Sequence, residues 1–358
     1  MTKSLAHFTP KEINSVLGCY DIGKLRCIES FQGGSSKNPK LLITTDQGKY
    51  LLKRRADTQR DRLSMAHTIQ RRLAHKAFPV SILVKDREQS GSIVSLGEQL
   101  YELFVYMDGT RYNGSKPQTL TTGKSLAQLH QSLLSLKLTK KTTSTSFHNS
   151  KVVRSHLHTI GANQPGQQKQ LFQEAARDLA VQYNQASSHV NELGFDTWPY
   201  QAIHGDYHPG NLLFSGDVLQ AVIDFDSVRI ASPMIDLANG LLQFSILAGH
   251  PDPAHWPDGF DTTRLRHVMQ GYCQVSKPNQ AQLESVPDLM IETMIAEAVL
   301  PIAATGSFGQ FCGLAFMKMI QRKARWLNEK HNALTKLFKA AARDATASAV
   351  PTEIKTAI

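Results

Sequence analysis

Apolar residues in the first third of the chain come in short runs that end at polar or glycine-containing turns. Such runs predict β-strands, and a glycine-rich connection between the first two predicts a hairpin. The predicted strands are residues 25–31, 40–45, 50–55, 80–84, 92–96 and 99–107.

Two helices are predicted in the same part of the chain. Thr9 and Glu12 have the spacing of a capping box, which predicts a short helix that ends near Gly18. Apolar side chains recur at helical spacing over residues 61–77, and this pattern predicts the second helix.

Helical spacing dominates the rest of the chain. Long polar stretches at residues 137–149 and 250–260 predict loops. The small, threonine-rich end, residues 340–358, predicts a loosely ordered tail. The predicted helices are residues 119–135, 167–193, a helix that starts at Pro233, and residues 308–326.

One stretch interrupts the helical pattern. Residues 202–229, AIHGDYHPGNLLFSGDVLQAVIDFDSVR, contain short apolar runs between polar clusters. The turn residues 215–217 predict a hairpin, and folding it brings the end of its second strand back to the loop before its first. Asp206, Asn211 and Asp224 are therefore expected to converge.

These three residue types suit phosphoryl transfer, in which a protein mainly positions reactants and neutralises charge. Asp206 is expected to accept the proton of an attacking hydroxyl. Asn211 and Asp224 offer oxygen ligands, which Mg²⁺ bound to the phosphates of ATP requires. The alternative is a turn-rich loop in which these residues only cap and turn the backbone.

The spacing is similar to the catalytic and metal-binding loops of kinases, with Gly205 where those loops have arginine. On the residues HGDYHPGN and VIDFD, the chain resembles the aminoglycoside phosphotransferase family, kinase-like small-molecule kinases that include choline, homoserine and methylthioribose kinases. The resemblance implies an α+β, bilobal, protein-kinase-like fold. Its expected parts are an N-terminal antiparallel sheet lobe that binds nucleotide (residues 1–107), a larger, mainly helical lobe with the catalytic loop and acceptor site (108–340), and the tail (341–358).

The resemblance also implies roles for single residues. Lys53 takes the position of the lysine that contacts the ATP phosphates, and Asp236 that of an acid that braces the catalytic loop. From its place in the loop, His204 is expected to be a buried brace for the same loop in preference to a proton carrier. The glycine-rich turn would approach the phosphates through its backbone, and the end of the last predicted strand would meet adenine. The residues concerned are Gly33, Gly34, Ser35 and Ser36 in the turn, and Phe104, Tyr106 and Met107 in the strand.

The chain departs from the family pattern on the helix at 61–77. Kinase-like folds place a glutamate there to hold the phosphate-binding lysine, whereas the central turns here carry His67 and Gln70. Either Lys53 is held in another way, through His67 for example, or activity is lower than the catalytic loop suggests. Arg54 and Arg55, next to Lys53, are candidates for contact with an anion, but surface charge is the preferred interpretation.

Composition narrows the choice of partners. The 358 residues carry a net charge of +10, which fits an anionic ligand such as ATP but also nucleic acid or a membrane surface. The sequence has no long Lys/Arg run of the kind that binds nucleic acid. It also has no apolar run that approaches the ~20 residues needed to span a bilayer. The four cysteines are scattered, as in reduced proteins, so a cytoplasmic location is expected.

The predicted function is ATP-dependent transfer of the γ-phosphate to a hydroxyl of a small molecule, such as an aminoglycoside, homoserine, choline or a sugar. Acids could line the site of a cationic acceptor, although solvated helix faces explain them equally well. These acids are Asp252, Asp258, Glu292 and Glu297. Two alternatives are a non-catalytic nucleotide-binding scaffold or regulator and a Ser/Thr protein kinase. The acceptor, the use of GTP and the oligomeric state stay open.

Overall fold

The computed structural model describes residues 8–31, 38–56, 60–136, 147–160, 162 and 166–347. Its contacts divide the chain into two compact units. Unit 1 contains residues up to Arg111 together with Asn211–Val228, and unit 2 contains Tyr112–Gly210 together with the chain from Arg229 onward. Each unit is described by itself.

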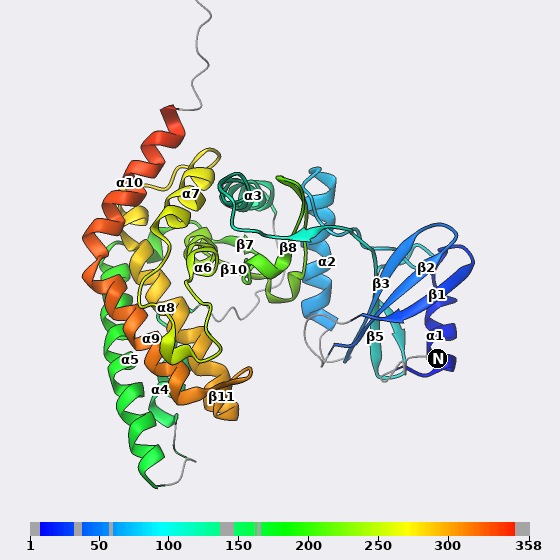
Figure 1. Ribbon diagram of the computed structural model, residues 1–358. Helices are drawn as coiled ribbons and strands as arrows, with labels where there is room; N and C mark the ends of the chain where they lie inside the picture. The colour runs from blue at the N-terminus through cyan, green and yellow to red at the C-terminus, as the bar shows by residue number, and fades with distance from the viewer. Residues whose placement is uncertain are drawn as a thin grey trace, which may run out of the picture. The chain divides into compact units, whose positions relative to one another are not determined.

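Unit 1 contains a five-stranded antiparallel sheet with the strand order β1-β2-β3-β5-β4 (Figure 1). In its centre, β3 pairs with β5 so that Lys53 lies opposite Glu102. The strands are β1 (Leu25–Ser30), β2 (Lys40–Thr45), β3 (Lys49–Ala56), β4 (Val94–Leu96) and β5 (Gln99–Val105).

Two helices belong to the same unit. In α1 (Pro10–Leu17), the side chain of Thr9 accepts a hydrogen bond from the backbone N–H of Glu12, and the side-chain carboxylate of Glu12 accepts one from the backbone N–H of Thr9. The predicted capping box is therefore confirmed. The second helix, α2 (Arg60–His75), buries the apolar face that its sequence predicted. Apolar side chains of α1 and of the sheet form one core, which includes Ile13, Val16, Leu41, Ile43, Leu52 and Leu103.

A second, three-stranded sheet of unit 1 has the order β6-β8-β9. Strands β8 (Leu212–Ser215) and β9 (Val218–Val222) form the predicted hairpin, and Gly216 in its turn has φ +56°, a conformation that suits glycine. The short β6 (Thr110–Arg111) pairs with β8. Two 3₁₀ helices flank the hairpin, η3 (Pro209–Asn211) before it and η4 (Phe225–Ser227) after it.

Unit 2 is mainly helical (Figure 1). Its longest buried element is α8 (Gln280–Thr305), against which α4, α5, α6, α9 and α10 pack. The other helices are α3 (Lys116–Leu133), α4 (Lys151–Thr159), α5 (Gly166–Glu192), α6 (Pro233–Ser245), α7 (Thr262–Cys273), α9 (Gly313–Glu329) and α10 (His331–Ala347), with the 3₁₀ helices η2 (Phe195–Thr197) and η5 (Pro253–His255).

Helices α3 and α7 approach closely because each has a glycine at the contact. A Cβ atom on Gly123 would lie 1.9 Å from the carbonyl oxygen of Val268, and one on Gly271 would lie 2.0 Å from that of Leu120. Any side chain at either position would push the two helices apart.

Two small ribbons complete unit 2. Strand β7 (Gln201–Ile203) pairs antiparallel with β10 (Arg229–Ala231), and this pairing sets the start of the loop that follows β7. Strands β11 (Ser307–Phe308) and β12 (Phe311–Cys312) form a hairpin between α8 and α9.

Three predicted elements differ from the structure. Residues 80–84 make only isolated bridges, at Val80 and Leu83, because their backbones pair with two different strands. The predicted helix at 308–326 begins only at Gly313, after the β11–β12 hairpin. Residues 341–347 continue α10 instead of starting the tail, because Ala341 and Ala345 are buried on one helix face.

Two further predictions fall outside the described residues. They are the glycine-rich turn with Gly33, Gly34, Ser35 and Ser36, and most of the loop at 137–149. In the part of the chain that the structure describes, no helix combines the length and apolar character needed to cross a bilayer.

Candidate active site

Lys53 of β3 lies among carboxylates in unit 1. Its Nζ is 3.0 Å from Oδ1 of Asp224 and 3.4 Å from each carboxylate oxygen of Asp226. Lys53 is buried, and the two carboxylates are partly open to solvent. Asp224 has φ +63°, an uncommon conformation for a residue with a side chain. The backbone at this point is held in a form that aims the carboxylate at the lysine.

The β8–β9 hairpin brings Asn211 and Asp224 together. Asn211 precedes β8, Asp224 follows β9, and the backbone N–H of Ile223 donates to the carbonyl of Asn211 at 2.9 Å. The hairpin therefore places the backbones of these two residues side by side, as their predicted convergence requires. Asn211 is buried, at 5% exposure.

A buried network extends from Asp226 into the sheet. Arg55 donates two parallel hydrogen bonds to Asp226, one of them 2.6 Å from Nη1 to Oδ2. The Nε of Arg55 donates to Glu102 at 2.6 Å, and His67 lies 2.7 Å from the other oxygen of Glu102. The second ring nitrogen of His67 is 2.7 Å from the hydroxyl of Ser92. Arg55, His67 and Glu102 are each almost wholly buried.

The positive charges of this network lower the pKa values of its two carboxyl groups. Burial alone would raise the pKa of Asp226, but Arg55 and Lys53 hold that pKa well below its usual range. The same holds for Glu102, where burial is outweighed by His67, Arg55 and Lys53. Both carboxylates are therefore ionised at neutral pH.

Lys40 adds a further cation to this region. It lies opposite Lys53 in the β2–β3 pair, and burial, together with the charge of Lys53, lowers the pKa of Lys40. One face of the sheet thus gathers Lys40, Lys53 and Arg55 near the Asp224 and Asp226 carboxylates. Such a gathering of cations suits a polyanionic ligand.

The loop around Asp206 belongs to unit 2, and Asp236 of α6 holds its backbone. The two oxygens of Asp236 accept the N–H of His204 at 2.7 Å and that of Gly205 at 2.8 Å. His130 of α3 lies 3.2 Å from the first of these oxygens. Asp236 is fully buried, which opposes its ionisation, but His130 and the backbone donors keep its pKa below the usual range.

His204 supports the same loop from within. It is fully buried, and its Nδ1 accepts a hydrogen bond of 3.3 Å from the N–H of Asp206. Gly205, with φ +78°, lets the chain turn sharply before Asp206. Asp206 itself is partly open to solvent, and its Oδ2 is 3.6 Å from Nε2 of His208.

Glu297 of α8 is the second acid of this region. Gln243 donates to it at 2.8 Å. Burial and, after it, the charge of Asp206 raise the pKa of Glu297 to about 7, against the opposing charges of His208 and Arg229. Arg229 also donates to the carbonyl of Gly205 at 3.2 Å. Unit 2 therefore places two acids and a guanidinium around the end of the loop.

The chain can now be compared with known proteins. Residues 28–284 match the sequence model of the phosphotransferase enzyme family. The chain belongs to the phosphotransferase enzyme family. The predicted class of reaction, ATP-dependent transfer of phosphate to a hydroxyl of a small molecule, is confirmed, and so is the kinase-like fold class.

Two homoserine kinases are related to this phosphotransferase in sequence. The one from Parvibaculum lavamentivorans is 28% identical over 285 residues, which cover 77% of this chain and 80% of that protein. The one from Zymomonas mobilis is 28% identical over 220 residues, 60% of this chain and 64% of that protein.

Solved structures share the fold at low sequence identity. A microcompartment-associated aminopropanol kinase has a TM-score of 0.65 at 15% identity, covering 91% of this chain and 99% of that one. An amicoumacin kinase, solved with AMP-PNP and Ca²⁺, has a TM-score of 0.63 at 13% identity, covering 93% and 96%.

The other residues singled out from the sequence have these positions. Phe104 is buried on β5, opposite Leu51, and Tyr106 and Met107 follow the strand as half-buried residues. His67 does not contact Lys53 but binds Glu102. Three of the four acids considered for the acceptor have other partners: Glu292 accepts hydrogen bonds from His148 and Asn149, Asp258 pairs with Arg322, and Asp252 caps η5. The fourth, Glu297, is near enough to Asp206 for the charge of Asp206 to raise its pKa.

Sequence reasoning missed three residues of the network around Lys53. Arg55 is not surface charge, as it was interpreted, but is buried at 2% exposure, since alternate residues of a strand face the same side and Arg55 shares that of Lys53. This spacing could have been recognised. Glu102 and Lys40 could not, because only the strand register brings them opposite Lys53.

Proposed function

We propose that this phosphotransferase moves the γ-phosphate of ATP to the side-chain hydroxyl of a small amino acid alcohol of the homoserine type. The observation that carries the proposal is the group of opposite charges in unit 2. Asp206 lies at the end of a braced loop, and the carboxyl of Glu297 is close enough to Asp206 and Arg229 for their charges to shift its pKa. The relationship to two homoserine kinases supports the same acceptor class.

On the nucleotide side, we assign the phosphates of ATP to Lys53 and to the backbone of the Gly33–Ser36 turn. Phe104, Tyr106 and Met107 are assigned to the adenine. Asn211 and Asp224 would hold Mg²⁺, and two observations fit this role. The hairpin joins their backbones, and the carboxylate of Asp224 is partly open to solvent. Bound Mg²⁺ would neutralise charge on the phosphates.

Asp206 is assigned to accept the proton of the acceptor hydroxyl as that oxygen attacks phosphorus. A carboxylate in this role must be ionised and correctly aimed. The backbone around it is fixed on one side by Asp236 and on the other by His204, so the direction of its side chain is restricted. We assign positioning roles to both of these residues.

Glu297 and Arg229 are assigned to the two charged ends of the acceptor. An amino acid alcohol carries an ammonium and a carboxylate next to each other, and a nearby acid and guanidinium match them with opposite charge. A bound ammonium would also favour the ionised form of Glu297, whose pKa of about 7 leaves it partly protonated in the free enzyme at neutral pH.

Arg55, Glu102 and His67 are assigned to the task that a helix glutamate has in other kinase-like folds. Glu102 lies opposite Lys53 on the neighbouring strand, and Arg55 joins it to Asp226. We infer that the cations facing the phosphates are anchored by a carboxylate of β5, Glu102, which His67 of α2 holds from its other side. This arrangement supports an active enzyme in preference to a non-catalytic scaffold.

The test is ADP release by the purified protein with Mg²⁺ and ATP against matched acceptors. The panel contains L-homoserine, 3-amino-1-propanol, ethanolamine, an aminoglycoside and a sugar, and phosphorylated products are identified by mass and ³¹P NMR. The proposal expects the highest kcat/KM with homoserine. Preference for an aminoglycoside or a sugar would overturn the acceptor, and phosphate found only on proteins of an added lysate would overturn the small-molecule assignment. A cytoplasmic location, where ATP and amino acids are available, is part of this proposal.

A further inference from the structure

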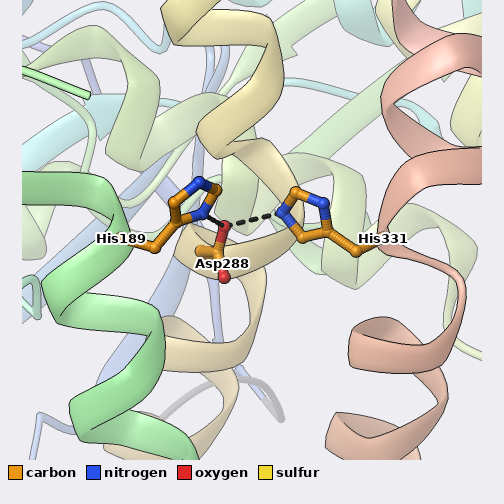
Figure 2. A group of neighbouring side chains, drawn as sticks. All are labelled: His189, Asp288 and His331. Atoms are coloured by element: carbon orange, nitrogen blue, oxygen red, sulfur yellow. Dashed lines mark hydrogen bonds and ion pairs between the residues drawn. The ribbon is translucent and has the colours of Figure 1, made fainter. Parts of the chain in front are cut away.

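Three side chains that the proposed reaction does not use meet in unit 2. They are His189 near the end of α5, Asp288 in the middle of α8 and His331 at the start of α10. Figure 2 shows both imidazole rings turned toward one carboxylate oxygen. In the described part of the chain, this is the one group of three His, Cys, Asp or Glu side chains that could hold a metal ion together.

The distances within the group are short. Nδ1 of His189 and Nε2 of His331 each lie 2.8 Å from Oδ2 of Asp288. The two rings face each other edge-on, with centroids 5.4 Å apart, and all three potential ligand atoms lie within 4.8 Å of one another. The three atoms therefore surround one small volume instead of pointing away from each other.

Burial differs among the three residues. The side chain of Asp288 is 6% exposed, that of His331 19% and that of His189 37%. A buried carboxylate is costly without a compensating positive charge. The open side next to His189 gives solvent, and hence a dissolved ion, a way to reach the carboxylate.

We propose that His189, Asp288 and His331 form a binding site for a divalent transition-metal ion, with zinc the best match. Two imidazoles and one carboxylate are ligands that zinc accepts, and three protein ligands leave a fourth position for water. Mg²⁺ and Ca²⁺ prefer sites built from oxygen atoms, so this donor set also separates the site from the nucleotide site.

The two separations to Asp288 need only a small adjustment to accept the ion. With bonds of roughly 2.0–2.1 Å, ligand atoms in a tetrahedral zinc site lie about 3.3 Å apart. The observed separations of 2.8 Å to Asp288 would widen by about half an ångström on this basis. On binding, the proton that a neutral imidazole now directs at the carboxylate moves to the other nitrogen of that ring, and a charged imidazole releases it to solvent. The freed lone pair then coordinates the metal.

The position of the site suggests what a bound ion would do. His331 directly follows Lys330, where α9 ends and α10 begins, and the other two ligands come from α5 and α8. An ion would join these helices at the point where the chain changes direction. We therefore expect metal binding to stabilise unit 2 and not to take part in phosphoryl transfer.

The test uses the full-length protein, freed of any affinity tag and stripped with a chelator, without nucleotide. Zinc binding is measured by calorimetry, and cobalt(II) by its visible absorption, which reports tetrahedral nitrogen and oxygen ligation. We compare wild type with His189→Gln and His331→Gln, both at partly exposed positions. His158→Gln, an exposed histidine of α4, is the matched control. Circular dichroism and thermal unfolding check that each variant is folded.

The proposal expects one zinc ion per chain in wild type and in the His158 variant, with a higher unfolding temperature when zinc is bound. Each of the other two variants should weaken binding by more than roughly 100-fold, since loss of a direct ligand exceeds the loss of an outer partner. Absence of zinc binding in wild type, or binding of equal strength in the His189 and His331 variants, would overturn the site. The three residues would then form a hydrogen-bonded cluster only.

Discussion

The two units treat their functional acids in opposite ways. In unit 1, the buried Glu102 and the half-buried Asp226 lie close to Arg55 and Lys53, and their pKa values are lowered. In unit 2, the half-buried Glu297 is near enough to another acid, Asp206, for its charge to act, and the pKa of Glu297 is raised to about 7. The same residue type is thus fully ionised in one region and poised to gain or lose a proton in the other.

This difference matches the ligand that we propose for each region. Phosphate groups need cations that stay in place, and ionised acids behind those cations hold them in position. An acceptor that brings its own ammonium needs an acid whose charge is still uncompensated. A bound cation would offset the repulsion between the carboxylates of Glu297 and Asp206.

The largest effect is expected at Asp206. Asp206→Asn removes the proton acceptor but keeps the side-chain shape, so kcat should fall by ~10²–10⁴-fold. Affinity for ATP, measured by calorimetry, should change little, because the phosphate contacts are assigned to unit 1. Asp196→Asn, an exposed carboxylate of unit 2, is the control. Equal turnover in the Asp206 variant and wild type would remove Asp206 from the reaction.

The next effect concerns the anchored cations of unit 1. Arg55→Gln leaves two carboxylates without their shared partner, and breaking such a buried pair costs ~3–5 kcal/mol of unfolding free energy. The neighbouring Arg54 pairs with Glu12 at 2.8 Å but is more exposed, so Arg54→Gln should cost about 1 kcal/mol or less. Urea unfolding measures both. Similar losses of stability in the two variants would mean that the buried network does not anchor the sheet. An unchanged KM for ATP in Arg55→Gln would mean that the network does not support nucleotide binding.

A smaller effect is expected at the brace of the catalytic loop. Asp236→Ala leaves two buried N–H groups without an acceptor, at about 1–3 kcal/mol each, and should also lower kcat. Because the folded pKa of Asp236 lies below its ordinary 3.8, its ionised form stabilises the protein above that pH. This contribution is lost as the pH falls through the lower, folded value. The variant should therefore show a weaker acid-induced loss of stability than wild type, and an identical pH dependence would contradict the assignment.

The smallest effect is the pH dependence that Glu297 gives to unit 2, and its sign is opposite to that of Asp236. The pKa of Glu297 is raised from 4.5 to about 7, so the neutral form stabilises the fold and this contribution is lost as the pH rises through about 7. The ionised form is the one that binds an ammonium. KM for an amino acceptor should therefore fall as the pH rises through about 7, while Glu297→Gln should show no such change. Initial rates between pH 5.5 and 8.5 measure it, and a flat profile in wild type would contradict it.

Local patterns were sufficient for much of this molecule. The capping box at Thr9, the hairpin turn at Gly216 and the spacing from Asn211 to Asp224 are short-range features, and the backbone that they predict is the one observed. The family resemblance then supplied the fold class. Short-range rules worked here because turns and caps depend on a few neighbouring residues.

The network around Lys53 shows where such rules stop. Glu102 is 47 positions from Arg55 in the chain, and their contact depends on the register between β3 and β5. The sequence showed that α2 lacks a glutamate, but it could not show that a strand supplies one. Val80 and Leu83 were misinterpreted for a related reason, since each bridges to a distant strand.

The most direct test of the proposed function compares L-homoserine with 4-hydroxybutyrate, which lacks the amino group, as acceptors for wild type and Glu297→Gln. Discrimination by a site that pairs with a polar group should favour homoserine in kcat/KM by at least about 100-fold in wild type. Most of that preference should disappear in the variant, while the rate with 4-hydroxybutyrate stays close to that of wild type. Equal use of both alcohols by wild type, or an unchanged preference in Glu297→Gln, would contradict an amino acid alcohol held by the acids of unit 2.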